Sequence, residues 1–357
     1  MSITFTHWGT ANIQMQRLFV FGFPELYGGA GTELYHQILI WQFMGMEVHL
    51  IPPWRVERNP LYPEMLARGV HIHPVNDYSS LTEEDPIFSF CNGEFLELLP
   101  QIRTYTKKTV FVNCMSWLFP QEKEAMRKGE IAMFLYQNER VMQENKIKLK
   151  AFNKNPKIQF KKFIPYFHRE DFPFIEKRRN EYFGCGRISR QEADKFAKDT
   201  LFIYESFVSP IPKRGLFLGF GKRSEEKTGP PPPWIRTALN QEEVSQQEFY
   251  QHCEIILQPS NTVENWPRIG FEAMSSGSVL IVDNAGGWQQ MIEHGKTGWL
   301  CNNERDFIYY ASKMAYEPNQ RYDMAAAARE RGLLLSNKES SLESWKEIFT
   351  VLNNMDI

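Results

Sequence analysis

The amino-acid sequence predicts an α/β protein built from two doubly wound parallel-sheet domains. Its 357 residues exceed the usual size of one domain, and 42% of them are hydrophobic, which is enough for two buried cores. Short apolar runs alternate with helical patterns along the chain, as is typical of a parallel sheet covered on both faces. This alternation restarts after a polar, proline-punctuated segment at residues 166–173. We therefore expect one domain over residues 1–166 and a second over residues 174–339.

The first domain is expected to start with the buried strand Arg17–Gly22, a short apolar run that ends in glycine. A glycine-rich turn at residues 27–31 then precedes a helical pattern over Thr32–Phe43. Helical patterns also lie at Gly93–Arg103 and Gln121–Gly129, between further expected strands. These strands are Glu47–Ile51, Val70–Pro74, Ile87–Cys91, Thr109–Asn113 and Ile131–Tyr136, and the run Ile158–Pro165 leads into the segment at residues 166–173.

The second domain repeats this order without repeating the sequence. Helices are expected over Gln191–Phe207 and near Pro267–Ser276, and a loop over Gly221–Pro233 contains four consecutive prolines, which cannot join a central strand. A last helix, about Ser340–Asn353, carries large apolar residues on one face. The expected strands are Glu181–Cys185, Gly215–Gly219, Glu254–Gln258 and Val279–Asp283.

Composition excludes several classes of protein. A formal net charge of −2 argues against a general nucleic-acid binder, whose excess of basic residues shows in the total charge. The five cysteines are scattered and form no C-x-x-C pair, which fits free thiols in a reducing compartment. The N-terminus has no signal-peptide pattern, and no apolar run approaches the roughly 20 residues that span a bilayer. We expect a soluble, cytoplasmic protein.

The most informative segment is Gln258–Gly277, QPSNTVENWPRIGFEAMSSG. Glu264 and Glu272 lie there between an expected strand and an expected helix. Ligands of open parallel sheets collect at the carboxyl ends of strands, and a helix N-terminus favours a phosphate. A carboxylate can also accept two hydrogen bonds from a vicinal diol. A single glutamate would more often be a solvated first-turn residue, but the whole run in this setting favours a binding site.

The run from Glu264 through Glu272 resembles the paired-glutamate motif of the large retaining glycosyltransferase family that includes sucrose synthase and bacterial mannosyltransferases. The segment GCGRISRQEADK at 184–195 resembles that family's cationic segment, and HGKTG at 294–298 resembles another of its motifs. The similarity is clearest over Tyr182–Cys301 and fainter over Arg17–Pro52. It implies the GT-B fold, in which two Rossmann-like domains face a central cleft and the terminal helix, residues 340–357, packs back on the first domain.

The resemblance also implies roles for individual residues. Glu272 would hold the donor's ribose hydroxyls, and Glu264 would contact the donor sugar. Arg187 would bind the diphosphate with Lys195 or Arg190, because cations can stabilise a departing diphosphate without a metal. Arg187, Lys195 and Glu264 are thus the expected catalytic residues. The remaining donor-binding residues would be Asn265, Trp266 and Pro267, together with Gly29, Ala30 and Gly31 of the first-domain loop.

The acceptor side is less defined, because the family's histidine after a middle strand has no counterpart in Val112–Trp117. Asn113 or Ser116 could supply hydrogen bonds there, Asn92 could contact the acceptor or simply form a turn, and His36 could reach the cleft or pair with Glu33. The acceptor would be sugar-containing or lipid-linked. Residues 140–162 hold eight Lys or Arg and one acid, Glu144, which fits a solvated helix face or a peripheral membrane contact.

We expect no catalytic metal and no bound cofactor other than the nucleotide-sugar co-substrate. The sequence contains no Asp-x-Asp motif, and His71 and His73 alone would make a poor metal site, so we interpret them as packing residues. The sequence therefore predicts a retaining, metal-independent glycosyltransferase. Three alternatives remain at this point: an inverting transferase of the same fold, a sugar-nucleotide epimerase, and a non-catalytic carbohydrate-binding protein.

Overall fold

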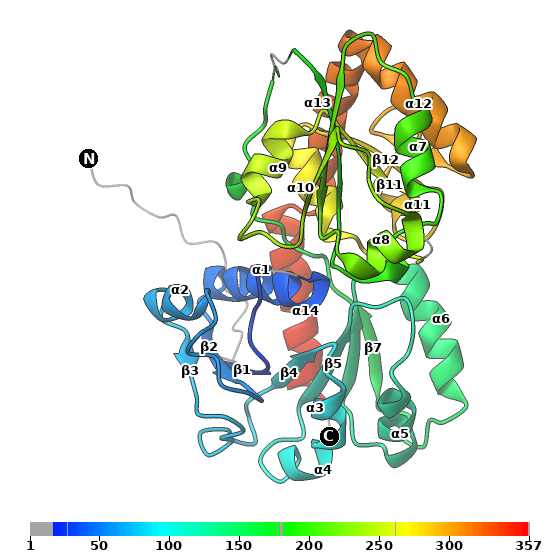
Figure 1. The fold of residues 1–357 in the computed structure, drawn as a ribbon. Helices are drawn as coiled ribbons and strands as arrows, with labels where there is room; N and C mark the ends of the chain where they lie inside the picture. Colours follow the sequence, from blue (N-terminus) through cyan, green and yellow to red (C-terminus); the bar gives the residue numbers. More distant parts are fainter. Residues whose placement is uncertain (1–16, 27, 177, 179–180, 261, 356–357) are drawn as a thin grey trace. The chain divides into compact units, whose positions relative to one another are not determined.

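The computed structural model describes residues 17–26, 28–176, 178, 181–260 and 262–355 (Figure 1). These residues form two compact units. Unit 1 contains the described residues up to Leu26, residues 30–166 and the chain from Lys338 onward. Unit 2 contains Phe167–Asn337 together with Gly28 and Gly29. Each unit has its own parallel sheet.

The sheet of unit 1 has seven strands in the order β3-β2-β1-β4-β5-β6-β7, and each adjacent pair is parallel. From β1 the chain adds strands toward one edge, and from β4 it adds them toward the other, which is a doubly wound topology. The strands are β1 (Arg17–Phe21), β2 (Glu47–Ile51), β3 (His71–Ile72), β4 (Ile87–Phe90), β5 (Thr109–Asn113), β6 (Met133–Tyr136) and β7 (Gln159–Lys162).

Helices of unit 1 bury both faces of this sheet, because successive strand residues alternate between two apolar clusters. Leu18 and Val20 join the cluster with α1 and α14, whereas Phe19 and Phe21 join the cluster with α3, α5 and α6. The helices are α1 (Gly29–Phe43), α2 (Tyr62–Ala67), α3 (Gly93–Glu97), α4 (Leu99–Ile102), α5 (Pro120–Lys128), α6 (Glu139–Lys150) and α14 (Lys338–Asn353).

The last helix, α14 (red in Figure 1), belongs to unit 1 although unit 2 precedes it in the sequence. Its Trp345 is fully buried, and the indole Nε1–H donates to Gln37 Oε1 of α1 at 2.7 Å. The same ring packs edge-on against Trp41, with 5.1 Å between the ring centroids. The apolar face formed by this helix therefore completes the core of unit 1.

The sheet of unit 2 has six strands in the order β10-β9-β8-β11-β12-β13, again with every adjacent pair parallel. Val279 and Ile281 of β12 face one apolar cluster, and Leu280 and Val282 face the other, so both faces are covered. The strands are β8 (Phe183–Ile188), β9 (Lys213–Leu218), β10 (Ile235–Ala238), β11 (Ile255–Gln258), β12 (Val279–Asp283) and β13 (Trp299–Cys301).

The helices of unit 2 show where the sequence-based expectations were wrong. The helix expected over Gln191–Phe207 is a short 3-10 turn, η2 (Ala193–Lys195), followed by α7 (Thr200–Ser206), and the expected loop over 221–233 contains α8 (Lys222–Thr228). The other helical elements are η1 (Arg169–Asp171), α9 (Gln246–His252), α10 (Arg268–Ser276), α11 (Trp288–Met291), α12 (Glu304–Tyr316) and α13 (Pro318–Leu335).

Two parallel-sheet α/β units confirm the predicted fold class. The five cysteines are free thiols, three of them buried. Across the described residues, every helix is too short or too polar to cross a bilayer.

Candidate functional site

Each sheet contains one point where the strand order reverses, and ligands of open α/β sheets bind beyond the carboxyl ends of strands at such a point. In unit 2 this point lies between β8 and β11. The loop after β8 carries Arg190 and Lys195, and the loop after β11 carries Glu264. The two segments singled out in the sequence therefore leave neighbouring strands at the same edge of the sheet.

Lys195 and Glu264 meet across these two loops. Lys195 Nζ donates to Glu264 Oε1 at 2.6 Å, although 69 residues separate them in the sequence. The side chains are 19% and 28% exposed, so both groups remain within reach of a ligand from solvent. A partly buried, directly hydrogen-bonded ion pair at the carboxyl edge of a sheet can bind an anion through its ammonium and hydroxyl groups through its carboxylate.

Arg187, near the end of β8, ties the two loops together. Its Nη1 donates to Ser189 Oγ at 2.8 Å, and its Nη2 donates to the carbonyl oxygens of Lys195 and, at 3.4 Å, Pro259. The guanidinium carbon lies 3.7 Å from the ring centroid of Phe196. Only 1% of the residue is exposed, and burial lowers the pKa of Arg187 to about 10, so it still carries its charge at neutral pH.

A further ionisable group at this edge, Asp283, was not predicted as a site residue. Asp283 ends β12, and its Oδ2 accepts a hydrogen bond from the backbone N–H of Ser260 at 2.8 Å. Burial raises the pKa of Asp283 to about 6, with Arg187 opposing the shift and Glu264 adding to it. The only local signal was an aspartate directly after the apolar run VLIV, because its contacts involve residues 23 positions away.

The backbone around Glu264 fits against two glycines that follow β12. Gly287 N–H donates to the carbonyl oxygen of Glu264 at 2.7 Å. A Cβ at Gly286 would clash with that same oxygen, and a Cβ at Gly287 would clash with the carbonyl oxygen of Asn265. The close approach of the two backbones therefore requires glycine at both positions. This contact fixes the loop that presents Glu264.

Glu272 lies on α10, five residues into the helix, and faces α9. Tyr250 Oη donates to its Oε2 at 2.7 Å, and Gln246 Nε2 donates to the same oxygen at 3.2 Å. The residue is 6% exposed, and burial raises the pKa of Glu272. Its hydrogen-bond partners come from α9, whereas the partner of Glu264 comes from the loop after β8, so the paired glutamates occupy two different environments.

The residues between the two glutamates form the entrance to α10. Asn265 is 4% exposed, Trp266 packs against Phe271 with ring centroids 6.0 Å apart, and Pro267 is the residue before the first helical turn. Arg190 Nη2 pairs with Glu192 at 3.1 Å on the surface, whereas Lys195 pairs with Glu264 of the paired-glutamate loop.

The predicted glycine-rich residues start α1, the first helix after β1 in the sequence. Gly29, Ala30 and Gly31 form its first turn, and a Cβ at Gly31 would lie 2.6 Å from the Cβ of Glu25. His36 lies in the same helix with 7% exposure, and its Nδ1–H donates to the carbonyl oxygen of Thr32 at 2.8 Å.

The predicted acceptor-side asparagines both make local structural bonds. Asn92 is the N-cap of α3, where its side chain accepts from Glu94 N–H at 3.0 Å. Asn113 is fully buried, and its Nδ2 donates to Trp117 O and Glu122 Oε2, each at 3.0 Å. Ser116 is half-buried and lies in the turn between Asn113 and Glu122. Sequence reasoning missed Glu122, a buried acid whose pKa is raised to about 7 by burial.

Comparison with known proteins places this geometry in context. Residues 236–331 match the model of the family described as glycosyl transferases group 1. The matched segment includes Glu264, Glu272 and Asp283, and it begins after Arg187 and Lys195. No curated protein sequence matches the chain.

Several solved structures resemble the chain over nearly its whole length. HepE from Anabaena, in complex with UDP and glucose, is 13% identical with a TM-score of 0.72, covering 94% of this chain and 99% of that one. Sucrose-phosphate synthase from Thermosynechococcus elongatus is 12% identical with a TM-score of 0.70 and the same coverage of both chains. A glycosyltransferase from Rickettsia africae is 15% identical with a TM-score of 0.68, covering 95% of this chain and 99% of that one.

At such low identities the structural likeness establishes the fold, and the matched segment adds a family relationship for part of the chain. The chain therefore has the GT-B fold, and its residues 236–331 match the glycosyl transferases group 1 model; together these findings support its being a glycosyltransferase.

Proposed function

We propose that the protein is a retaining, metal-independent glycosyltransferase that moves a sugar from a nucleotide-diphosphate sugar to an acceptor hydroxyl. The observation that carries the proposal is the ion pair of Lys195 and Glu264, held at the strand-order reversal of unit 2 beside Arg187. Glu264 also lies within the segment that matches the group 1 family.

In the proposed donor complex, the diphosphate replaces Glu264 as the ion-pair partner of the Lys195 ammonium. The nucleoside diphosphate gains negative charge as it leaves, and a preorganised cation stabilises that charge most in the transition state. Arg187 supports this role by holding the Lys195 carbonyl and by its fixed positive charge. Two cations in these positions would supply the electrostatic stabilisation for which other transferases use a metal ion.

The two carboxylates would then each bind one of the remaining parts of the donor. Glu264, freed from Lys195, would accept hydrogen bonds from the sugar hydroxyls. Glu272 would accept from the ribose hydroxyls through Oε1, because Tyr250 and Gln246 both donate to its Oε2. Retention follows if a leaving phosphate oxygen takes the acceptor's proton, since the new bond then forms on the face from which the phosphate departs.

The acceptor is proposed to be a sugar-containing or lipid-linked alcohol. The basic side chains of α6, including Lys146, Lys148 and Lys150, are exposed and could meet an anionic membrane surface. UDP-glucose is the first donor to test, because HepE has been crystallised with UDP-glucose and with UDP and glucose.

The test is a transfer reaction with a panel of nucleotide sugars and simple glycoside acceptors, followed by NMR of the product's anomeric proton. We expect the product to have the same anomeric configuration as the donor, with an unchanged rate when a chelator is added. An inverted product would contradict retention, and activity abolished by the chelator and restored by Mg²⁺ or Mn²⁺ would contradict metal independence. Epimerised donor formed without any acceptor would instead identify an epimerase.

A further inference from the structure

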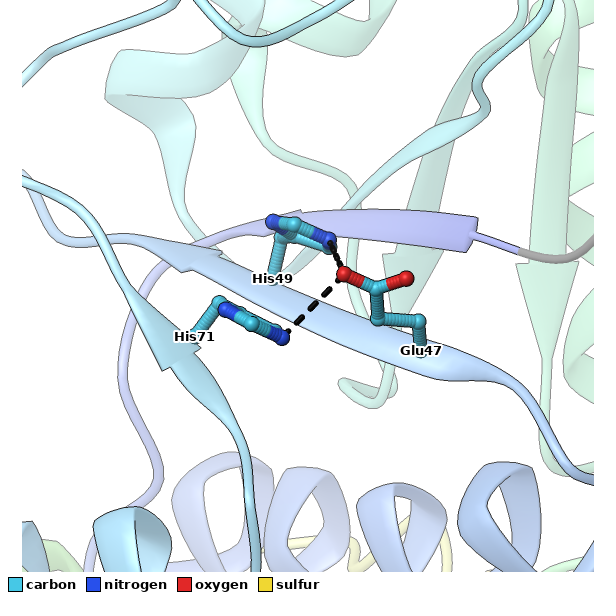
Figure 2. A group of neighbouring side chains, drawn as sticks. All are labelled: Glu47, His49 and His71. Carbon is cyan, nitrogen blue, oxygen red and sulfur yellow. Dashed lines mark hydrogen bonds and ion pairs between the residues drawn. The ribbon is translucent and has the colours of Figure 1, made fainter.

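Three histidines and one glutamate gather on one face of the unit 1 sheet, outside every residue assigned to the donor site. His49 of β2 is the register partner of His71 on the edge strand β3. Glu47 precedes His49 by two residues and His73 follows His71 by two, so all four side chains project from the same side of the sheet. Figure 2 shows Glu47 reaching toward both His49 and His71.

Both imidazoles place Nε2 beside the same carboxylate oxygen. His49 Nε2 lies 3.0 Å from Glu47 Oε1, and His71 Nε2 lies 3.1 Å from the same oxygen. All three atoms lie within 4.8 Å of one another. The two rings are stacked with 14° between their planes, so an ion would take all three atoms as ligands after a rotation of the exposed His71 side chain.

The surroundings hold His49 in the required orientation. Its ring stacks on Phe19 with centroids 4.5 Å apart and on His71 at 4.6 Å. Its second nitrogen, Nδ1, lies 2.9 Å from His73 Nε2. Metal-binding histidines almost always hydrogen-bond through the nitrogen that does not face the ion, which fixes the tautomer. His73 provides that partner here.

Exposure also suits an ion. His49 is buried, whereas the side chains of His71 and Glu47 are 53% and 47% exposed, which leaves an open path from solvent.

We propose that Glu47, His49 and His71 bind one divalent transition-metal ion, with Zn²⁺ as the probe, and that water fills the remaining position. Two imidazoles and one carboxylate favour zinc, nickel or cobalt over magnesium or calcium, which prefer oxygen ligands. Each ring binds the metal in its neutral form, with its single proton moved from Nε2 to Nδ1 and the Nε2 lone pair on the metal. His49 Nδ1–H then donates to His73 Nε2, and His73 carries its own proton on Nδ1.

The ion is a structural one. Glu47 and His71 begin their strands, so the site lies near the amino ends of β2 and β3, whereas α1 begins beyond the carboxyl end of β1 in the same unit. The edge strand β3 has only two residues, and a metal bridge from His71 to β2 would anchor it. The proposed donor chemistry does not pass through this ion.

The test is isothermal titration of the full-length, chelator-treated protein with Zn²⁺, alongside the visible absorption spectrum after Co²⁺ addition. We expect one ion per chain, intense Co²⁺ bands typical of low coordination number, and a higher melting temperature with Zn²⁺. His71→Ala and Glu47→Gln should abolish these signals, and His73→Ala should weaken Zn²⁺ binding by roughly 10–100-fold, as expected for an outer partner.

His168→Ala is the matched control, because His168 pairs with a glutamate at 3.1 Å and is also partly exposed, but belongs to no such cluster of the described residues. It should bind Zn²⁺ as the wild type does. The proposal is overturned if the wild type binds no Zn²⁺ at micromolar concentration, or if His71→Ala binds it as tightly as the wild type. Neither outcome bears on sugar transfer, because the readout is metal binding alone.

Discussion

Lys195 and Glu264 are each only partly exposed, so solvent weakens their attraction less than it would at an open surface. If a ligand separates this ion pair, each of the two side chains needs a new partner in the ligand. In the proposed complex Lys195 turns to the diphosphate and Glu264 turns to the sugar. The pair is then an arrangement prepared for ligand exchange, and its two members should respond differently to substitution.

Replacing Lys195 with Met should lower kcat/KM for transfer by about 10²–10³-fold, because one preorganised charge is removed from the transition state. Lys195→Arg should restore part of this loss. Steady-state kinetics with a saturating acceptor provide the measurement. The control is Lys313→Met, which breaks the ion pair of a similarly exposed lysine on α12 with Glu317 and should leave the rate unchanged. Equal effects of both substitutions would remove Lys195 from the mechanism.

Glu272→Ala should mainly weaken nucleotide binding, by roughly 10–100-fold, which corresponds to losing hydrogen bonds to a charged group. Turnover at saturating donor should change little. Titration calorimetry with the nucleoside diphosphate measures this directly. Tyr250→Phe removes only the hydrogen bond that Glu272 accepts at 2.7 Å and should produce a smaller effect in the same direction. Unchanged nucleotide affinity in Glu272→Ala would show that another residue holds the ribose.

Glu122 should make the free energy of unfolding depend on pH, independently of any catalytic role. Burial raises its pKa from 4.5 to about 7, so the folded state holds a proton that the unfolded chain has lost in that range. Its contribution to stability is therefore complete below about pH 4.5 and is lost as the pH rises through 7. The free energy of unfolding should fall by roughly 3 kcal/mol over this range relative to Glu122→Gln. Urea denaturation measures the free energy of unfolding at each pH. Equal pH slopes for the wild type and Glu122→Gln would refute this prediction.

At the scale of elements, the strands were the most predictable part of the fold. Fully buried parallel strands are continuous apolar runs, and β2 and β5 begin and end where the sequence predicted. Helices of the second unit were harder to locate. The polar run after β8 was expected to be helical, but it forms a turn whose Lys195 pairs with Glu264 on a distant loop. The local periodicity of the sequence cannot predict such a contact.

The loop between β11 and α10 depends on the glycine pair after β12. Gly287→Ala should displace the backbone of Glu264 and Asn265, since the added Cβ would clash with the Asn265 carbonyl oxygen. We expect a loss of donor affinity of at least about tenfold with a native circular dichroism spectrum, because a small displacement at such a site is costly. Gly332→Ala in α13 is the control, as its Cβ would meet Met274 only at ordinary contact distance. Wild-type affinity in Gly287→Ala would contradict the role given to this contact.

At the scale of the whole molecule, two doubly wound sheets each provide a strand-order reversal, and the residues of the proposed donor site in unit 2 cluster at one of them. Sequence motifs singled out Arg187, Lys195 and Glu264 as candidates because they lie in segments with a recognisable local pattern. They could not reveal Asp283, Tyr250 or the histidine cluster, since each depends on strand order or on helix packing. His49 and His71 are neighbours only because β2 and β3 pair.

The central claim is that a nucleotide-sugar binds at the carboxyl edge of the unit 2 sheet through Lys195, Glu264 and Glu272. Its most direct test is titration calorimetry of the chelator-treated wild type with a panel of nucleotide sugars, repeated with Lys195→Met and Glu272→Ala. We predict one-to-one binding of at least one nucleotide sugar to the wild type and weaker binding by each variant. Binding of that ligand with equal affinity to all three proteins, or of no member of the panel to the wild type, would contradict the claim.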